Sequence, residues 1–166
     1  PAGYVECGGM KRLKRAAMSY EQLRLGNQIC FPLYIASRLF VREYQPYLDA
    51  LELTYPQYLV LLVLWETDAL TVGEIAEKLL LNTNTITPLL KRMEAQGLIN
   101  RQRSGQDERK VIVTLTPKGK ELQIEAASIP DKLVAGLNSD HVNAEDLKTL
   151  KDLLYQIINH LSKRQE

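Results

Sequence analysis

The sequence has 166 residues, 45% of them hydrophobic, and its 21 lysines and arginines are nearly balanced by 20 aspartates and glutamates. This length and composition suit one compact domain, or two subunits that share a core. A nucleic-acid-binding protein usually carries a basic excess, so a DNA surface would have to come from locally clustered charge. The two cysteines and two histidines have no zinc-site spacing, so we expect neither metal nor cofactor.

The same features indicate a compartment. Two lone cysteines are not a disulfide framework and fit reduced thiols in the cytoplasm. The longest apolar run, 58–65, is much shorter than the roughly 20 residues of a membrane-spanning helix. The basic residues near the N-terminus are followed by no apolar stretch of a secretory signal. We therefore expect a cytoplasmic protein without a membrane partner.

The first long helix is predicted from Tyr20 to about Tyr47. Pro32 lies inside it and either kinks the helix or marks where its second half begins. A short helical turn is expected at 49–53. Apolar residues recur in the long helix at spacings of three and four, which places them on one face: these are Leu33, Ala36, Leu39, Phe40 and Tyr44.

A helix-turn-helix unit is predicted in the middle of the chain, after a nearly all-apolar helix at 55–65. Thr71 and Glu74 form a capping box that opens a short helix ending at Leu80. After a brief turn, a second helix runs to about Gln96, and the glycine that follows suits the left-handed position at a helix end. Two helices joined by so short a turn form a helix-turn-helix unit.

A β-hairpin follows the second helix. Residues 98–103 and 110–115 read as strands around a polar turn, which is the position of a wing. Thr116 and Pro117 supply the N-cap and first residue of another helix. The last segment, 144–162, carries an apolar stripe that is wide for a surface helix of a small monomer, so it suggests packing against a second copy.

The fold class is therefore mainly α with a small β-hairpin wing, a winged helix-turn-helix. Residues 1–19 are expected to be a tail, disordered or partly foreign to the natural chain. Residues 20–166 are expected to form a single domain. Its DNA-binding winged helix covers about 54–116, and its dimerisation helices cover about 20–47 and 117–164.

The outer face of the second helix predicts DNA contact. Short hydroxyl and amide side chains near its N-terminal end can hydrogen-bond base edges and phosphates without holding the helix away from the groove. Two basic residues farther along suit phosphate contacts. The residues expected on this face are Thr83, Asn84, Thr85, Thr87, Lys91 and Arg92.

The wing supplies a local basic excess, because four cations and two anions lie between residues 101 and 110. Arg109 can reach an adjacent minor groove, whose negative potential attracts arginine. Asp107 is expected to orient that guanidinium, and Arg103 is a further expected DNA contact. Taken alone, these charges are equally typical of a solvated turn. Two copies related by a dyad would place their recognition helices roughly 34 Å apart, which predicts a palindromic operator.

Cys30 is a candidate redox site. A cysteine in a helix is commonly a small buried apolar residue. Its surroundings favour another interpretation, because the chain has eight tyrosines against two phenylalanines, and five of the tyrosines lie between 34 and 58. Phenols near a thiol can donate hydrogen bonds to a thiolate, which would make the sulfur a fast nucleophile toward peroxides.

Four segments resemble a known family. They read Asn-Gln-Ile-Cys-Phe-Pro-Leu-Tyr at 27–34, Leu-Thr-Tyr-Pro-Gln-Tyr at 53–58, Leu-Leu-Lys-Arg-Met-Glu at 89–94 and Asp-Glu-Arg at 107–109. From about Leu23 onward the chain resembles the MarR family and, more narrowly, its organic-hydroperoxide-sensing (OhrR-type) branch. The resemblance implies a winged-helix homodimer whose N- and C-terminal helices form the interface.

The resemblance also implies roles for single residues. Cys30 corresponds to the peroxide-sensing cysteine, and Tyr34 to a nearby tyrosine of its pocket. Tyr44 and Tyr55 match tyrosines that reach the cysteine from the partner subunit. Because no cysteine follows Cys30, the chain resembles members with one cysteine, in which sulfenic acid passes to a mixed disulfide with a small thiol or to a sulfenamide.

On the DNA side, Thr85 and Arg92 match recognition-helix positions, and Asp107 and Arg109 match the wing pair. Together these observations predict a homodimeric repressor, not an enzyme, that binds double-stranded operator DNA and is released when an organic hydroperoxide oxidises Cys30. One alternative is a MarR-type repressor released by a small phenolic ligand. Another is a thiol peroxidase, which the missing resolving cysteine argues against. A third, a DNA-architectural protein without a switch, leaves the tyrosines unexplained.

Overall fold

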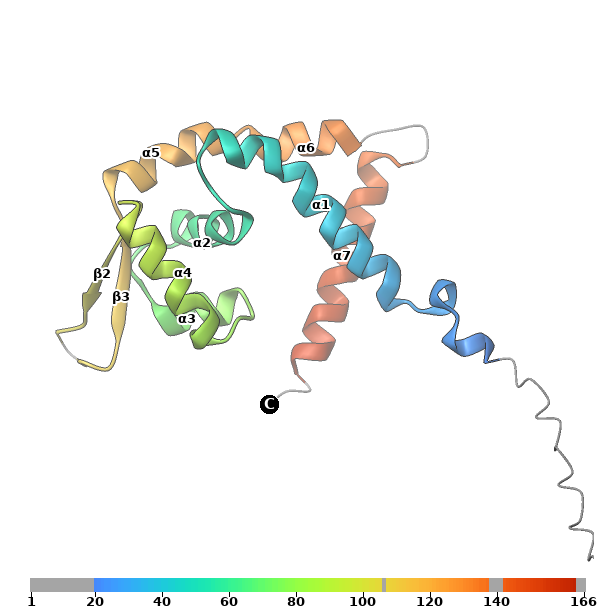
Figure 1. Ribbon diagram of the computed structural model, residues 1–166, viewed down its shortest axis with the longest axis horizontal. Coiled ribbons are helices and arrows are strands. Elements are labelled where there is room, and N and C mark those ends of the chain that lie inside the picture. The colour runs from blue at the N-terminus through green and yellow to red at the C-terminus, as the bar shows by residue number, and fades with distance from the viewer. Residues whose placement is uncertain (1–19, 106, 138–141, 164–166) are drawn as a thin grey trace, which may run out of the picture. The chain divides into compact units, whose positions relative to one another are not determined.

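The computed structural model describes residues 20–105, 107–137 and 142–163 (Figure 1). The chain forms two compact units, residues 1–39 and 40–166. The predicted tail at 1–19 lies outside the described residues, and the assignment of 20–166 to a single domain stays a prediction.

The described part of the first unit consists of two 3₁₀ turns, η1 (Glu21–Leu23) and η2 (Leu25–Asn27), and the beginning of α1 (Cys30–Ala50). The prediction of one helix from Tyr20 is therefore wrong for its first ten residues. The reason is Pro32, whose missing N–H costs nothing in the first turn of a helix but would break a bond in its middle. Pro32 thus lies where the helix begins.

The second unit carries the remaining elements. In chain order they are α2 (Tyr55–Glu66), β1 (Leu70–Thr71), α3 (Val72–Lys78), α4 (Thr83–Ala95), β2 (Ile99–Arg103), β3 (Val111–Leu115), α5 (Pro117–Ala126), α6 (Ile129–Leu137) and α7 (Ala144–Ser162). The helix-turn-helix of α3 and α4 is confirmed, and so is the β2–β3 hairpin that projects from the end of α4 (Figure 1).

The predicted helix ends are present as specific hydrogen bonds. The Thr71 Oγ1 atom accepts from the N–H of Glu74 at 3.2 Å, and Glu74 Oε2 accepts from the N–H of Thr71 at 2.7 Å, which completes the capping box. The Thr71 hydroxyl also donates to Glu74 Oε2 at 2.7 Å, and the two hydrogen bonds that Thr71 donates to this carboxylate, with a smaller effect of Lys110, hold the pKa of Glu74 below its ordinary value. Gly97 follows α4 with φ of +71°, the left-handed conformation that the sequence predicts.

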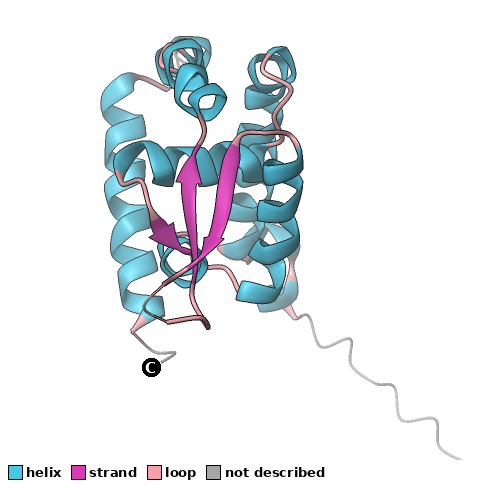
Figure 2. Ribbon diagram, turned by 90° about the vertical axis from the view of Figure 1, so that its left-hand side faces the viewer, coloured by secondary structure: helices cyan, strands magenta, loops and turns pink. Residues whose placement is uncertain are grey.

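The wing is part of a three-stranded antiparallel sheet in the order β1-β3-β2 (Figure 2). Ile99 pairs with Leu115 and Arg103 with Val111 along the hairpin. The third strand, β1, pairs Leu70 with Val113 and was not predicted. A strand of two residues is too short to show an alternating pattern of apolar and polar side chains in the sequence. Its pairing with β3 depends instead on where the end of α2 places these two residues.

One hydrophobic core lies beneath the helix-turn-helix and the sheet. It includes most of α2, as its apolar sequence predicts, and the inner stripe of α4. The largest fully buried side chains are Leu48, Val60, Leu61, Leu64, Ile75, Ile86, Leu90, Met93, Ile99 and Val113. Because α2, α3, α4 and the wing share this core, their relative positions are fixed by packing.

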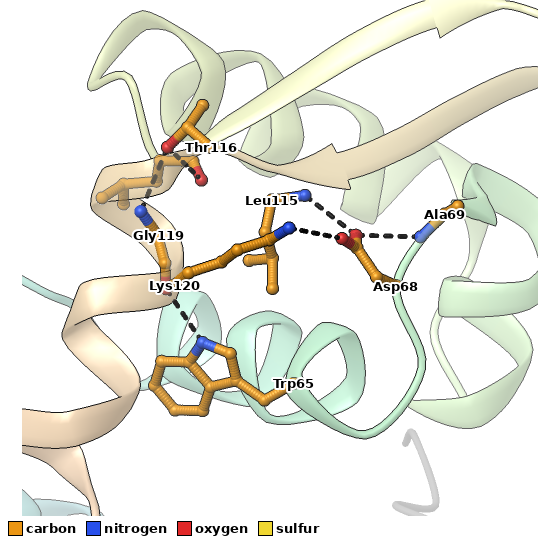
Figure 3. Close-up of polar contacts among 8 residues, drawn as sticks. Trp65, Asp68, Ala69, Leu115, Thr116, Gly119 and Lys120 are labelled. Atoms are coloured by element: carbon orange, nitrogen blue, oxygen red, sulfur yellow. Dashed lines mark hydrogen bonds and ion pairs between the residues drawn. The ribbon is translucent and has the colours of Figure 1, made fainter.

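Among the described glycines, Gly119 in the first turn of α5 has the least room for a side chain (Figure 3). A Cβ atom at this position would lie 2.2 Å from the carbonyl oxygen of Leu98, at the start of the wing. The Thr116 hydroxyl donates to Gly97 O at 2.7 Å and accepts from the N–H of Gly119 at 3.0 Å. The beginning of α5 is therefore held directly against the end of α4.

We expect Gly119→Ala to lower the free energy of unfolding by about 2–3 kcal/mol, because the new methyl group overlaps backbone that cannot yield. The measurement is urea denaturation at a fixed protein concentration. Gly136→Ala is the matched control: Gly136 lies on α6 with nothing within 4 Å of its Cβ position, so this variant should be as stable as the parent or more so. Equal stability of the two variants would contradict the close packing at Gly119.

Candidate nucleic-acid interface and tyrosine cluster

Helix α4 presents the predicted polar face to solvent. Its inner stripe is buried, which turns the opposite face outward. Thr83, Asn84, Thr85, Lys91 and Arg92 are all exposed. Thr87 is half-buried, and its hydroxyl donates to the carbonyl of Thr83 at 2.7 Å. The exposed first turns of α4 therefore carry small polar side chains and its second half carries cations.

A hollow of about 440 Å³, here the wing-side hollow, lies between the first turns of α3 and α4 and the wing. It brings predicted DNA residues of the helix and of the wing to one place. Its lining residues are Thr71, Val72, Gly73, Thr83, Thr87, Arg101, Arg109, Lys110 and Val111. Lys110 was not predicted to contact DNA. Its position beside Arg109 in a basic hairpin could have suggested such a contact.

A second hollow, of about 790 Å³, lies on the other flank of α4 beside the N-terminus of α2, and we call it the α2-side hollow. Thr85 and Arg92 line it from α4, and Thr54, Pro56 and Gln57 line it from the start of α2. Gln57 is only 4% exposed and joins the two helices, because its Nε2 donates to Gln96 Oε1 at 2.6 Å. Helix α4 is thus a ridge between two hollows, as expected for a helix that enters a groove between phosphate backbones.

The wing turn is shaped by Asp107. Its Oδ1 accepts from the backbone N–H of Arg109 at 3.0 Å, and its carbonyl accepts from the N–H of Lys110 at 2.9 Å. We predicted that the Asp107 carboxylate accepts a hydrogen bond from the Arg109 guanidinium. In the structure it accepts one from the backbone N–H of Arg109 instead. Arg103 and Arg109 are exposed. Asp107 therefore presents Arg109 by fixing the turn.

Arg101 has a different role from the other wing cations, because it contacts α4. Its side chain is 15% exposed, and its Nη1 lies 3.4 Å from Glu94 Oε2 on α4. Its backbone N–H also donates to Glu94 Oε1 at 3.1 Å. The alternation of side chains along β2 could have predicted this partly buried contact, because it places Arg101 on the same face of the strand as the buried Ile99. Arg101 fastens the wing to α4.

Three tyrosines form a second site in this unit, which we call the tyrosine cluster: Tyr44, Tyr55 and Tyr58. The ring of Tyr44 lies 5.1 Å from that of Tyr55 and 5.8 Å from that of Tyr58. Burial, together with the neighbouring phenols, raises the pKa of Tyr44 to about 12, and burial also raises the pKa of Tyr55. These phenols are therefore neutral hydrogen-bond donors at physiological pH. The family resemblance pairs Tyr44 with Tyr55, whereas Tyr58 was counted among the crowded tyrosines without a predicted role in the cysteine pocket.

The tyrosine cluster borders an apolar groove of about 470 Å³. The groove is lined by Phe40, Tyr44, Tyr55, Leu133, Val134, Leu137, Leu147, Leu150, Lys151, Leu154, Tyr155 and Ile158. Helix α7, predicted with the same ends, buries none of its side chains. Its exposed large apolar residues are Leu150, Leu153, Tyr155, Ile157, Ile158 and Leu161.

Cys30 and Tyr34 belong to the first unit. Cys30 is the first residue of α1 and its thiol is free and exposed, which differs from the buried apolar cysteine that a helical position commonly indicates. Tyr34 is exposed one turn later, and its phenol oxygen accepts from Arg38 Nη1 at 3.3 Å. Among the residues that the structure describes, no group of three or more metal-ligating side chains is placed to hold a metal ion.

A helix-turn-helix with a polar, partly basic outer face and a basic wing defines a winged-helix DNA-binding protein. In the described ranges no helix combines the length and the apolarity needed to cross a bilayer.

Comparison with known proteins agrees with this class. The sequence profile of the family described as transcriptional regulator SarA/Rot matches residues 42–125. The chain is 47% identical, over 145 residues, to the organic hydroperoxide resistance transcriptional regulator of Bacillus subtilis (strain 168), covering 87% of this chain and 97% of the relative.

Solved structures agree as well. Reduced AbfR bound to DNA is 40% identical with a TM-score of 0.69, covering 85% of this chain and 96% of that one. Overoxidised AbfR bound to DNA is also 40% identical, with a TM-score of 0.67 and coverage of 87% and 99%.

The chain belongs to the SarA/Rot family of winged-helix transcriptional regulators, and the predicted kinship with MarR-type regulators of the organic-hydroperoxide branch is confirmed. It is a DNA-binding transcriptional regulator, and the family membership confirms that it is not an enzyme. The roles of single residues stay predictions.

We expect Arg109→Ala to weaken operator binding and to reduce the slope of log Kobs against log salt concentration by about one per subunit, since one phosphate neutralisation is lost. Binding isotherms over a range of salt concentrations measure this slope. Arg42→Ala removes an arginine of α1 that is also exposed and should leave the slope unchanged. An Arg109→Ala slope equal to that of the parent would remove Arg109 from the interface.

Proposed function

We propose that this regulator is a homodimeric repressor that binds palindromic operator DNA and is released when an organic hydroperoxide oxidises Cys30. The observation that carries the proposal is the exposed thiol at the first residue of α1, within one of the segments by which the chain resembles organic-hydroperoxide-sensing regulators. DNA binding is already established by the family, so the proposal concerns the switch and the assembly.

A second copy of the chain suits the apolar surface of the second unit. An apolar groove of about 470 Å³ and the exposed stripe of α7 would both be costly to leave in water. In a two-fold dimer the same surface on each copy covers the other. We therefore propose that α1 and α7 form the dimer interface, with the two α4 helices one DNA turn apart.

The proposed chemistry begins with a thiolate. Cys30 is the first residue of α1, and its thiol is free. In the proposed dimer, the neutral phenols of Tyr44 and Tyr55 from the partner subunit donate hydrogen bonds to the sulfur, and Tyr34 lies one turn away on α1.

The hydroperoxide oxidises the Cys30 sulfur directly, without a cofactor. The Cys30 sulfur attacks the distal peroxide oxygen, the S–O bond forms and the O–O bond breaks, and the alkoxide takes a proton to leave as an alcohol. The sulfenic acid then condenses with a small cellular thiol to a mixed disulfide with loss of water, or with a backbone nitrogen to a sulfenamide. Small thiols are abundant in the cytoplasm, which is the proposed location.

Release follows from the size of the adduct. A mixed disulfide cannot fit among closely packed phenols, so the interface helices shift and the two α4 helices lose their spacing. An overoxidised relative has been found bound to DNA, which favours a bulky adduct over added acidic oxygens as the releasing event. Loss of one half-site removes much of the advantage of specific over non-specific binding, typically about 4–10 kcal/mol.

The apolar groove favours one alternative. Its volume of about 470 Å³ and its phenol oxygens are typical of a pocket for a small aromatic ligand. Under that alternative, a phenolic compound releases the operator under reducing conditions and Cys30→Ser responds normally. The thiol-peroxidase alternative does not agree with a family of transcriptional regulators.

We expect Cys30→Ser to bind operator DNA as tightly as the parent and to stay bound in excess cumene hydroperoxide, because serine cannot be oxidised to a disulfide-forming species. A gel shift with reduced and peroxide-treated protein measures this. Cys7→Ser, which removes the other cysteine, should be released like the parent. Release of Cys30→Ser by the peroxide would remove Cys30 from the switch.

We expect Tyr44→Phe to slow oxidation of Cys30 about tenfold, since one hydrogen bond to a charged group is lost. Stopped-flow kinetics of thiol loss with cumene hydroperoxide measure the rate constant. Tyr47→Phe is the control, because Tyr47 also lies on α1 but outside the tyrosine cluster, with Lys132 Nζ 5.9 Å from its ring centre. If Tyr44→Phe and Tyr47→Phe react as fast as the parent, Tyr44 does not act on the thiolate.

A further inference from the structure

The first turn of α5 is the meeting point of three parts of the second unit (Figure 3). We call residues 116–120 the α5 joint. The end of α2 reaches the joint through the indole of Trp65, whose Nε1 donates to the carbonyl of Gly119 at 2.9 Å. The chain that leaves α4 contacts the joint at Leu98, whose carbonyl oxygen accepts from the backbone N–H of Thr116 at 3.1 Å. A displacement of the α5 joint therefore displaces both neighbours.

Asp68 fastens the wing to the same place. Its Oδ1 accepts from the N–H of Leu115, the last residue of β3, and from the N–H of Ala69, each at 2.9 Å. Its Oδ2 lies 3.6 Å from Lys120 Nζ, on the α5 joint itself. Ala69 has φ of +61°, a conformation that costs an alanine about 1–2 kcal/mol and persists only where the surroundings enforce it. The corner after α2 is thus held in a fixed, strained geometry.

Trp65 also contacts the tyrosine cluster. Its ring lies 6.2 Å from that of Tyr58 in an edge-on arrangement, and Tyr58 lies 6.4 Å from Tyr55. The aromatic side chains therefore form a continuous packed series that begins at Tyr44 and ends at a hydrogen bond to the α5 joint. Packed aromatic rings transmit a displacement because the interior has little free volume.

We propose that Trp65 is a positioning residue that couples the tyrosine cluster to the α5 joint and thereby to the wing. The inference rests on the proposed function, in which Tyr44 and Tyr55 contact the Cys30 sulfur of the partner subunit. Displacement of these rings by an adduct moves Tyr58 and Trp65. The hydrogen bond from Trp65 then pulls the first turn of α5, to which β3 and the end of α4 are fastened.

The test uses Trp65→Phe, which keeps an aromatic ring against Tyr58 and removes the donor to Gly119. Operator Kd is measured by fluorescence anisotropy with reduced and with cumene-hydroperoxide-treated dimer. We expect oxidation to weaken binding at least fivefold less in Trp65→Phe than in the parent, because coupling between sites commonly amounts to a factor of about 5–150. Tyr58→Phe is the matched control: it keeps its ring, and we expect release equal to that of the parent. An oxidised-to-reduced Kd ratio in Trp65→Phe equal to that of the parent overturns the proposal.

A second measurement needs neither the variant nor the peroxide. Trp65 is the only tryptophan of the chain, so its emission reports on the α5 joint. Because coupling between binding sites is reciprocal, operator binding to the reduced parent should shift this emission, whereas a non-operator duplex at non-binding salt should not. Emission that does not change with the operator overturns the proposal, even if Trp65→Phe does not fold. A parent that shows the emission shift but is not released by hydroperoxide contradicts the proposed function and leaves the coupling supported.

Discussion

The structure of the second unit depends on the close approach of Gly119 to the carbonyl of Leu98. With no side chain at 119, the first turn of α5 lies directly on the chain that leaves α4, and a methyl group there would lie 2.2 Å from the oxygen. The same turn makes two further hydrogen bonds, from the Thr116 hydroxyl to Gly97 O and from Trp65 Nε1 to Gly119 O. The end of α2, the recognition helix and the base of the wing are therefore held by one turn of helix.

The predicted DNA surface shows how a nearly neutral chain can gather cations locally. The cations are divided between the two flanks of α4, with Arg92 in the α2-side hollow and Arg109 and Lys110 in the wing-side hollow. Two acidic residues nearby have internal partners, because Glu94 binds Arg101 and Asp107 closes the wing turn, whereas Glu52 lines the α2-side hollow with Arg92. The local excess of cations is therefore at the wing-side hollow, which Arg101, Arg109 and Lys110 line without an acidic residue.

Much of the fold was predictable because it depends on contacts local in sequence. The capping box of Thr71 and Glu74, the left-handed Gly97 and the helix at 144–162 were predicted from neighbouring residues and are confirmed. The helix predicted from Tyr20 failed in its first part, since apolar spacing alone does not show that Pro32 stands at a helix start. Likewise, the two residues of β1 form a strand only because β3 lies beside them.

By itself, the sequence determined the class of protein, the polar face of α4 and the identity of the candidate cysteine, because helical periodicity, caps and motifs are written in consecutive residues. Only the tertiary structure decided what the carboxylates and aromatic rings contact. Asp107 bonds to a backbone N–H, Arg101 turns toward α4, and Trp65 joins Tyr58 to Gly119, which lies 54 residues farther along the chain. Such partners are chosen by the packing of distant segments, and packing depends on the whole core rather than on any local pattern.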